Sequence, residues 1–138
     1  MAWLRLDPER SAFERTRSPK EVVAGRTAAW IYDIGEIDPE PYEFIVASRH
    51  QTRRTDVRFR RGVLSRMDWE IVDGLPVVRP HMIVTDLFSQ HVDIGHVADI
   101  AIGAVSKGLM SSKELTVAAQ FAPAPDAFIE DVLAGSAR

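Results

Sequence analysis

The chain has 138 residues, a length typical of one domain with its own hydrophobic core, so we expect residues 1–138 to form a single domain. Apolar residues make up 46% and charged residues 27%, which is typical of a folded globular protein rather than a disordered tail. The absence of cysteine excludes disulfides and thiolate metal sites, and the net charge of −3 excludes a surface that is positive throughout.

The N-terminal stretch "MAWLRLDPERSAFERTRSPK" is charged from Arg5 onward and lacks the apolar core of a signal peptide. No uninterrupted apolar run in the sequence approaches the roughly 20 residues needed to cross a bilayer. We therefore expect a cytoplasmic protein that has no membrane partner.

Helices are predicted in the first third of the chain. Ser18 and Glu21 match a capping box with Pro19 at the first helical position, which predicts a helix over "PKEVVAGRTAAWIY". A shorter helix is predicted at residues 8–15. The following "DIGEIDPEPYE" is predicted to be a loop, because its glycine and prolines disfavour regular structure.

The middle of the chain is predicted to form strands. Apolar and polar side chains alternate in "YEFIVAS" and "DVRFRR", and the polar "RHQTRRT" between them has the length of a hairpin connection. A second pair is predicted at Trp69–Val72 and Leu75–Val78, joined by Asp73-Gly74, since both turn positions tolerate positive φ. Pro76 lies in the second of these strands, which favours an edge position or an early end.

The last third returns to helix. Pro80 suits the first turn of "PHMIVTDLFSQ", and Asp93 can cap "IGHVADIAIGAVSKG", which Gly108 would end. Ser111 and Glu114 form another capping box, and Pro125 begins a final helix. The predicted class is α+β, with N-terminal helices, a small mostly antiparallel sheet with an Arg-rich ribbon, and C-terminal helices.

Charge is segregated along the chain. Residues 49–61 read "RHQTRRTDVRFRR", with six arginines and a histidine against the single carboxylate of Asp56. Just upstream, the loop at residues 33–43 carries five acids and no base. Two interpretations follow: the two segments neutralise one another, or the basic segment stays open to bind an anion.

The basic segment is the strongest functional signal. In the strand "DVRFRR", Arg58 and Arg60 are expected to project from one face, while Val57 and Phe59 enter the core. A planar guanidinium binds phosphate or carboxylate oxygens through two parallel hydrogen bonds. The candidate residues for binding nucleic acid or a protein partner are Arg49, Arg53, Arg54, Arg58, Arg60 and Arg61.

The sequence contains few of the motifs that are typical of enzymes. The sequence contains no glycine-rich phosphate loop, no G-x-S-x-G and no H-E-x-x-H. The best metal candidate is "HVDIGHVAD", but its Asp93 is needed as a helix cap and its His91 precedes the helix. We therefore predict no catalytic residues, no metal and no cofactor.

Two long segments of the chain carry a family resemblance. They are "AWIYDIGEIDPEPYEFIVASRHQTRRTDVRFRR" and "WEIVDGLPVVRPHMIVTDLFSQHVDIGHVADIAIGAV", and the most specific piece is the "DGLPV" hairpin leading into Pro80 and Thr85-Asp86-Leu87. Together they resemble the C-terminal region of AbiEi-type antitoxins of type IV toxin–antitoxin (abortive infection) systems. The resemblance covers residues 2–133.

The resemblance implies a function as well as a fold. In that family an N-terminal winged helix binds operator DNA, and the C-terminal region counteracts a nucleotidyltransferase-like toxin and can also contact DNA through a basic surface. The present sequence holds no winged helix ahead of "AWLRLDPERSAFER", so the resemblance supports the neutralising region alone. Within "VTDL", Asp86 is expected to be a structural hydrogen-bonding residue rather than a catalytic one.

Three functions are therefore considered. The first is a non-enzymatic antitoxin-like protein whose partner is a cognate nucleotidyltransferase-like toxin. The second is a stand-alone DNA-binding transcriptional regulator that contacts phosphates through the ribbon and reads few bases. The third is a small nucleic-acid enzyme whose site has no recognisable motif.

Overall fold

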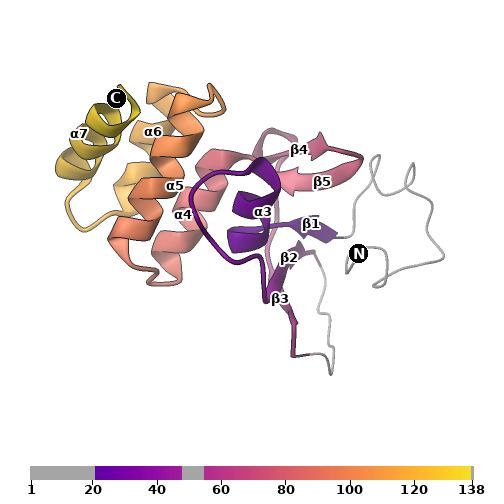
Figure 1. The fold of residues 1–138 in the computed structure, drawn as a ribbon. Helices are drawn as coiled ribbons and strands as arrows, with labels where there is room; N and C mark the ends of the chain where they lie inside the picture. The colour runs from indigo at the N-terminus through magenta and orange to yellow at the C-terminus, as the bar shows by residue number, and fades with distance from the viewer. Residues whose placement is uncertain (1–20, 48–54, 138) are drawn as a thin grey trace.

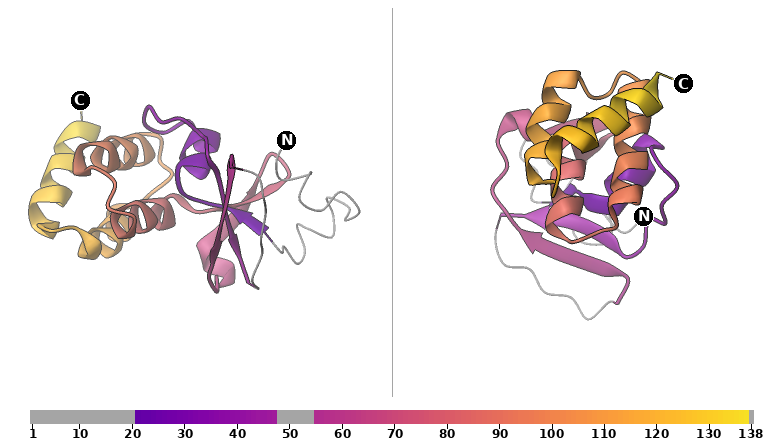
Figure 2. Two further views of the ribbon diagram at one scale, coloured as in Figure 1. Left: turned by 90° about the horizontal axis from the view of Figure 1, so that it is seen from below. Right: turned by 90° about the vertical axis from the view of Figure 1, so that its left-hand side faces the viewer.

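The structure, a computed structural model, describes residues 21–47 and 55–137. The predicted helix at residues 8–15 and the predicted cap at Ser18 lie outside these ranges. Within them the fold is α+β, as predicted: five α-helices accompany a five-stranded sheet. In both Figure 1 and Figure 2, helices α4 to α7 lie to one side of the sheet, and α3 lies between them and the strands.

The sheet is mixed rather than mostly antiparallel. Its strand order is β3-β2-β1-β5-β4, with antiparallel pairing in β1–β2 and β4–β5 and parallel pairing in β2–β3 and β1–β5. The strands are β1 (Glu21–Val23), β2 (Tyr42–Val46), β3 (Val57–Arg61), β4 (Trp69–Val72) and β5 (Leu75–Val78).

Strands β2 and β3 do not form the predicted hairpin. They run parallel, with Tyr42 opposite Val57 and Val46 opposite Arg61. The connection at residues 47–56 can span about 33 Å when extended, which is roughly twice the length of a five-residue strand. The chain can therefore return to the other end of β2 before β3 begins. The length of the connection is compatible with both parallel and antiparallel pairing, so it did not distinguish them.

The predicted helix that was to start at Pro19 instead contains a strand. Glu21–Val23 forms β1 in the centre of the sheet, and α3 (Gly25–Tyr32) begins only after it. Val22 and Val23 are buried there, and β-branched side chains suit a strand that is covered on both faces. Gly25 makes the change of direction with a φ of 56°, a value that favours glycine.

The β4–β5 hairpin is confirmed. Asp73 and Gly74 have φ values of 51° and 81°, as a type I′ turn requires. The prediction that Pro76 marks an edge strand is wrong, because β5 lies between β1 and β4. The short β1 pairs with β5 only through Val23 and Val77. Pro76 therefore faces no residue of β1, and the N–H that proline lacks is not needed for the pairing.

The helices of the last third begin where their caps predict. The Asp93 carboxylate accepts a hydrogen bond from the Gly95 N–H at 3.0 Å, and the Ser111–Glu114 capping box is formed. Gly108 has a φ of 73°, consistent with its predicted position after a helix end. The four helices are α4 (Pro80–Ser89), α5 (Ile94–Ser106), α6 (Ser112–Ala118) and α7 (Pro125–Ser136).

Candidate partner-binding surface

Three of the six candidate arginines lie in the described part of the chain, all on β3. Arg58 and Arg61 are exposed, whereas Arg60 is partly covered. Strand β3 is at one end of the sheet order, next to β2. Arg49, Arg53 and Arg54 lie outside the described residues.

Arg60 is not part of an open basic surface, contrary to the prediction. It lies opposite Ile45 of β2, a buried residue, and its Nη2 is 2.7 Å from Oδ2 of Asp86 on α4. The Asp86 side chain is only 12% exposed. The cause is the carboxylate that α4 places beside β3, which strand periodicity could not reveal.

Arg60 and Asp86 belong to a larger, partly buried cluster, which we call the Arg60 cluster: Glu43, Arg60, Asp86 and Gln90. With the Gln90 amide oriented to satisfy both neighbours, its nitrogen donates to Glu43 Oε1 at 3.2 Å and its oxygen accepts from Arg60 Nη1. Glu43 also accepts a hydrogen bond from the Arg26 backbone N–H at 2.8 Å, so its carboxylate caps the N-terminus of α3. The cluster thus joins β2, β3, α3 and α4.

Burial dominates the electrostatics of Asp86. Removal from water raises its pKa to about 6, and the Arg60 guanidinium only partly offsets this increase. The nearby Glu43 charge acts in the same direction as burial. These contacts give Asp86 the structural role that was expected from "VTDL".

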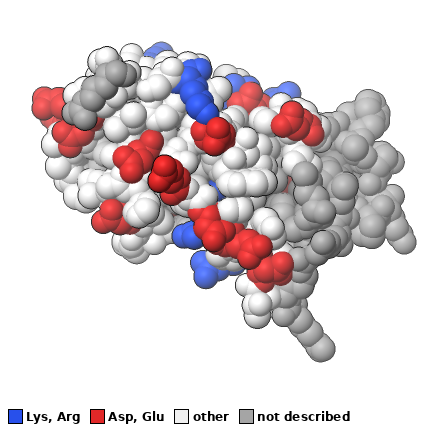
Figure 3. Space-filling model, viewed as in Figure 1, with Lys and Arg blue, Asp and Glu red and all other residues white. Residues whose placement is uncertain are grey.

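Arg58 shares a surface hollow with the acidic loop. The hollow has a volume of about 420 Å³ and is lined by Asp38, Glu40, Pro41, Thr55, Asp56 and Arg58. The Tyr42 N–H donates to the Asp56 carbonyl at 2.7 Å, which holds the end of the loop against the start of β3. Acidic side chains gather on the face of the molecule shown in Figure 3, with basic side chains beside some of them. The local charge around Arg58 is therefore mixed.

Beyond Arg61, residues 62–68 form what we call the β3–β4 segment. Val63 is 93% exposed and Met67 is 73% exposed, and Arg66 is exposed as well. The segment is nevertheless structured, because Ser65 and Asp68 form a capping box around a short 3₁₀-helix (Arg66–Asp68). It presents basic and apolar side chains on one ordered connection.

The metal-ligand pattern in "HVDIGHVAD" is not assembled. Asp93 caps α5, and His91 lies in the preceding turn with a φ of 58°. Among residues 21–47 and 55–137, no group of three histidine or carboxylate side chains is arranged to hold a metal ion.

Sequence reasoning missed a histidine between two carboxylates. His81 Nδ1 lies 3.3 Å from Glu114 Oε2, and His81 Nε2 lies 4.0 Å from Asp68 Oδ1. These residues come from α6, α4 and the end of the β3–β4 segment, and no spacing in the sequence relates them. Neither contact is a hydrogen bond, since Nδ1 has no hydrogen-bond partner among the described residues and 4.0 Å at Nε2 is too long for one, so the three side chains lie together without forming a bonded network.

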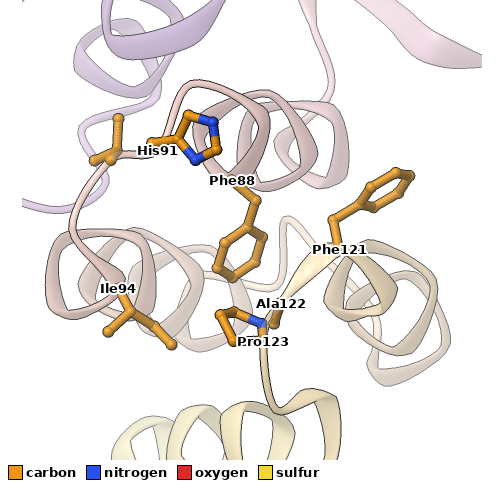
Figure 4. Close-up of a pocket in the computed structure, with 7 residues that line it drawn as sticks. Phe88, His91, Ile94, Phe121, Ala122 and Pro123 are labelled. Atoms are coloured by element: carbon orange, nitrogen blue, oxygen red, sulfur yellow. The ribbon is translucent and has the colours of Figure 1, made fainter.

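The helical half contains an apolar hollow of about 430 Å³, shown in Figure 4. Phe121 is 59% exposed beside it, and His91 contributes its imidazole. Its lining residues are Phe88, His91, Val92, Ile94, Phe121, Ala122 and Pro123. A lone histidine without a second ionisable group in the lining does not make a catalytic site.

Among the described residues, the longest helices are too short or too polar to cross a bilayer. Comparison with protein families, with curated proteins and with solved structures finds no match to this chain.

Proposed function

We propose that this chain is a non-enzymatic, antitoxin-like interaction domain of a cytoplasmic type IV toxin–antitoxin system, and that it neutralises a nucleotidyltransferase-like toxin. The observation that supports this proposal best is an exposed series of arginines on ordered backbone, made of Arg58 and Arg61 on β3 and Arg66 just beyond it. The resemblance of the chain to AbiEi-type antitoxins supplies the class of partner.

The use of the buried ionisable groups supports a binding role. Asp86 is paired with Arg60, and Glu43 caps α3. The Tyr32 hydroxyl donates to Glu70 Oε2 at 2.9 Å and so joins α3 to β4. Each of these groups has a structural partner, as expected where ionisable side chains serve to stabilise the fold.

The mechanism follows from charge. A nucleotidyltransferase-like fold binds a metal–nucleotide complex through carboxylates, so its active-site face is acidic. Guanidinium groups on a rigid strand can form bidentate hydrogen bonds to such carboxylates. The bound arginines would then block access of the nucleotide. Association through exposed charges is expected to weaken as salt is raised.

Co-expression with the nucleotidyltransferase-like product of an adjoining gene tests the proposal. We expect the wild-type chain to restore growth and to bind the purified toxin, and Arg61→Glu to impair both. Lys113→Glu on α6 makes the same change of charge at another exposed site and serves as the matched control. A chain that neither binds nor neutralises the toxin would contradict the proposal.

DNA binding is the competing outcome. In gel retardation with a duplex from the region upstream of the gene, a stand-alone regulator would shift the DNA at low micromolar protein in low salt and lose the shift with Arg58→Glu and Arg61→Glu. Such a result without toxin neutralisation would favour the regulator.

A further inference from the structure

The β3–β4 segment displays apolar side chains next to its one arginine, Arg66, and next to Arg61, which precedes it. Val63, at 93% exposure, is the most exposed large apolar residue of the described chain, and Met67 follows at 73%. Single exposed apolar residues are ordinary on protein surfaces, but here the two most exposed large apolar side chains of the described residues lie four positions apart on one connection.

This display is held rigidly. The Gly62 N–H donates to the Val46 carbonyl at 3.0 Å, which fixes the start of the segment to β2. Its other end is held by the Asp68 carbonyl, which accepts from the Arg79 N–H at 2.8 Å. Between these points Leu64 packs against the core. Anchors presented on preorganised backbone lose little conformational entropy when a partner binds.

Arg66 is positioned as well. Its guanidinium carbon lies 4.3 Å from the centroid of the Trp69 ring, and its Nη1 donates to the Trp69 carbonyl at 3.3 Å. Such a cation–π contact fixes the side chain while leaving its remaining N–H groups available. Arg61, Val63, Arg66 and Met67 therefore alternate basic and apolar character within seven residues of ordered chain.

We propose that the β3–β4 segment is the docking surface for a protein partner that offers an apolar depression rimmed by carboxylates. Arg61 and Arg66 are exposed beside Val63 and Met67, and the one acid of the segment, Asp68, is used in its capping box, so charge complementarity favours a negative rim. Met and Arg are enriched in the cores of protein interfaces, where an apolar side chain in a pocket carries much of the binding energy. This inference rests on the proposed function for the identity of that partner, the toxin.

Nucleic acid fits the segment less well. Sites for single strands stack bases on aromatic side chains, whereas the aromatic residue here, Trp69, is only 7% exposed and already covered by Arg66. Val63 and Met67 can offer a phosphate backbone neither a hydrogen bond nor a charge. A second copy of the chain also fits less well, because the large exposed side chains around the segment are basic or apolar, so two copies facing each other would bring like charges into one small interface.

Binding of the purified toxin, measured by titration calorimetry, tests the proposal. We expect Val63→Ser combined with Met67→Ser to raise the Kd roughly tenfold or more, as loss of interface anchors does. Val117→Ser is the matched control, since Val117 is exposed at 59% on α6, and it should change the Kd less than about twofold. Both positions are at the surface, so circular dichroism should show that each variant remains folded.

The possible results separate this inference from the proposed function. If the wild-type chain does not bind the toxin, both fail. If Arg61→Glu abolishes binding but the Val63/Met67 variant binds like wild type, the proposed function stands and the docking surface is refuted. Two further results for the Val63/Met67 variant, each with toxin binding intact, would likewise refute a toxin partner at this site. One is a tenfold loss of binding to duplex or single-stranded oligonucleotides. The other is a loss of self-association.

Discussion

The guanidinium of Arg60 and the carboxylate of Asp86 form an ion pair with an N–O distance of 2.7 Å that joins strand β3 to helix α4. The pair divides the arginines of β3 into two kinds. Arg60 stabilises the packing of a helix on the sheet, while Arg58 and Arg61 remain exposed to solvent. Side chains two apart on a strand share a face, so Arg58 and Arg60 lie on the same face, and the position of Asp86 separates the paired arginine from the exposed one.

The raised pKa of Asp86 makes stability depend on pH. Its pKa rises from 3.8 to about 6 on folding, so between these values the folded chain holds a proton that the unfolded chain releases. The contribution of this group to the free energy of unfolding should fall as pH rises through that window, by about 3 kcal/mol at most, and stay constant above it. Asp86→Asn should remove this dependence in urea unfolding measured from pH 4 to 7.

An exposed carboxylate supplies the control for that experiment. Asp99 on α5 is exposed, and Asp99→Asn, which removes one carboxylate from the surface, serves as the matched variant in the same measurements. If the Asp86→Asn profile is parallel to the wild-type profile, Asp86 is ionised in the folded chain at low pH and the pair is stronger than its burial indicates.

Removal of Arg60 should destabilise the folded chain, because the buried Asp86 carboxylate then has no cation beside it. At pH 7.5, Arg60→Met leaves Asp86 without its cation, and we expect a loss of about 2 kcal/mol, less than for a fully buried pair because Arg60 is 36% exposed. Adding Asp86→Asn should restore most of that stability. Thermal unfolding of both single variants and the double variant measures the coupling, and additive effects would contradict it.

Gly25 is predicted to be the least replaceable glycine of the sheet region. A Cβ at this position would overlap the Glu43 carboxylate, and its φ of 56° is unfavourable for other residues. Gly25→Ala should therefore cost about 3 kcal/mol, from backbone strain together with loss of the cap on α3. Gly74→Ala has a similar backbone penalty at a φ of 81° but meets open space, so it should cost only about 1 kcal/mol.

Local signals account for most of the elements that the sequence predicted correctly. The caps at Asp93 and Ser111, and the Asp73-Gly74 turn, depend on residues within three positions of one another. Their hydrogen bonds form in any context that allows the helix or hairpin, which is why sequence patterns locate them.

Interactions between distant residues account for the failures. Glu21–Val23 resembles a helix start, but its valines are buried in the centre of a sheet whose other strands come from later in the chain. Arg60 follows the alternation of an exposed face, yet it pairs with Asp86, which lies 26 positions further on, and is partly covered. The ordered display of Val63 and Met67 depends on Val46 and Arg79 in the same way. Periodicity describes which side chains share a face, and only the fold decides what covers that face.

Glu114 should affect stability with the opposite pH dependence to Asp86. The Ser111 backbone N–H donates to its carboxylate at 3.0 Å and lowers its pKa, with further contributions from the Ser111 hydroxyl and from His81 and Arg79. A lowered pKa means that the ionised form stabilises the folded chain above the ordinary pKa of Glu, and that this contribution is lost as pH falls. At pH 7, Glu114→Gln should cost about 0.5 kcal/mol, and the difference between the variant and the wild type should shrink as the pH falls below the ordinary pKa of Glu. Glu130→Gln, at an exposed position of α7, controls for general charge effects in the same urea titrations. A deficit for Glu114→Gln that does not shrink as the pH falls would mean that shape rather than charge makes this cap.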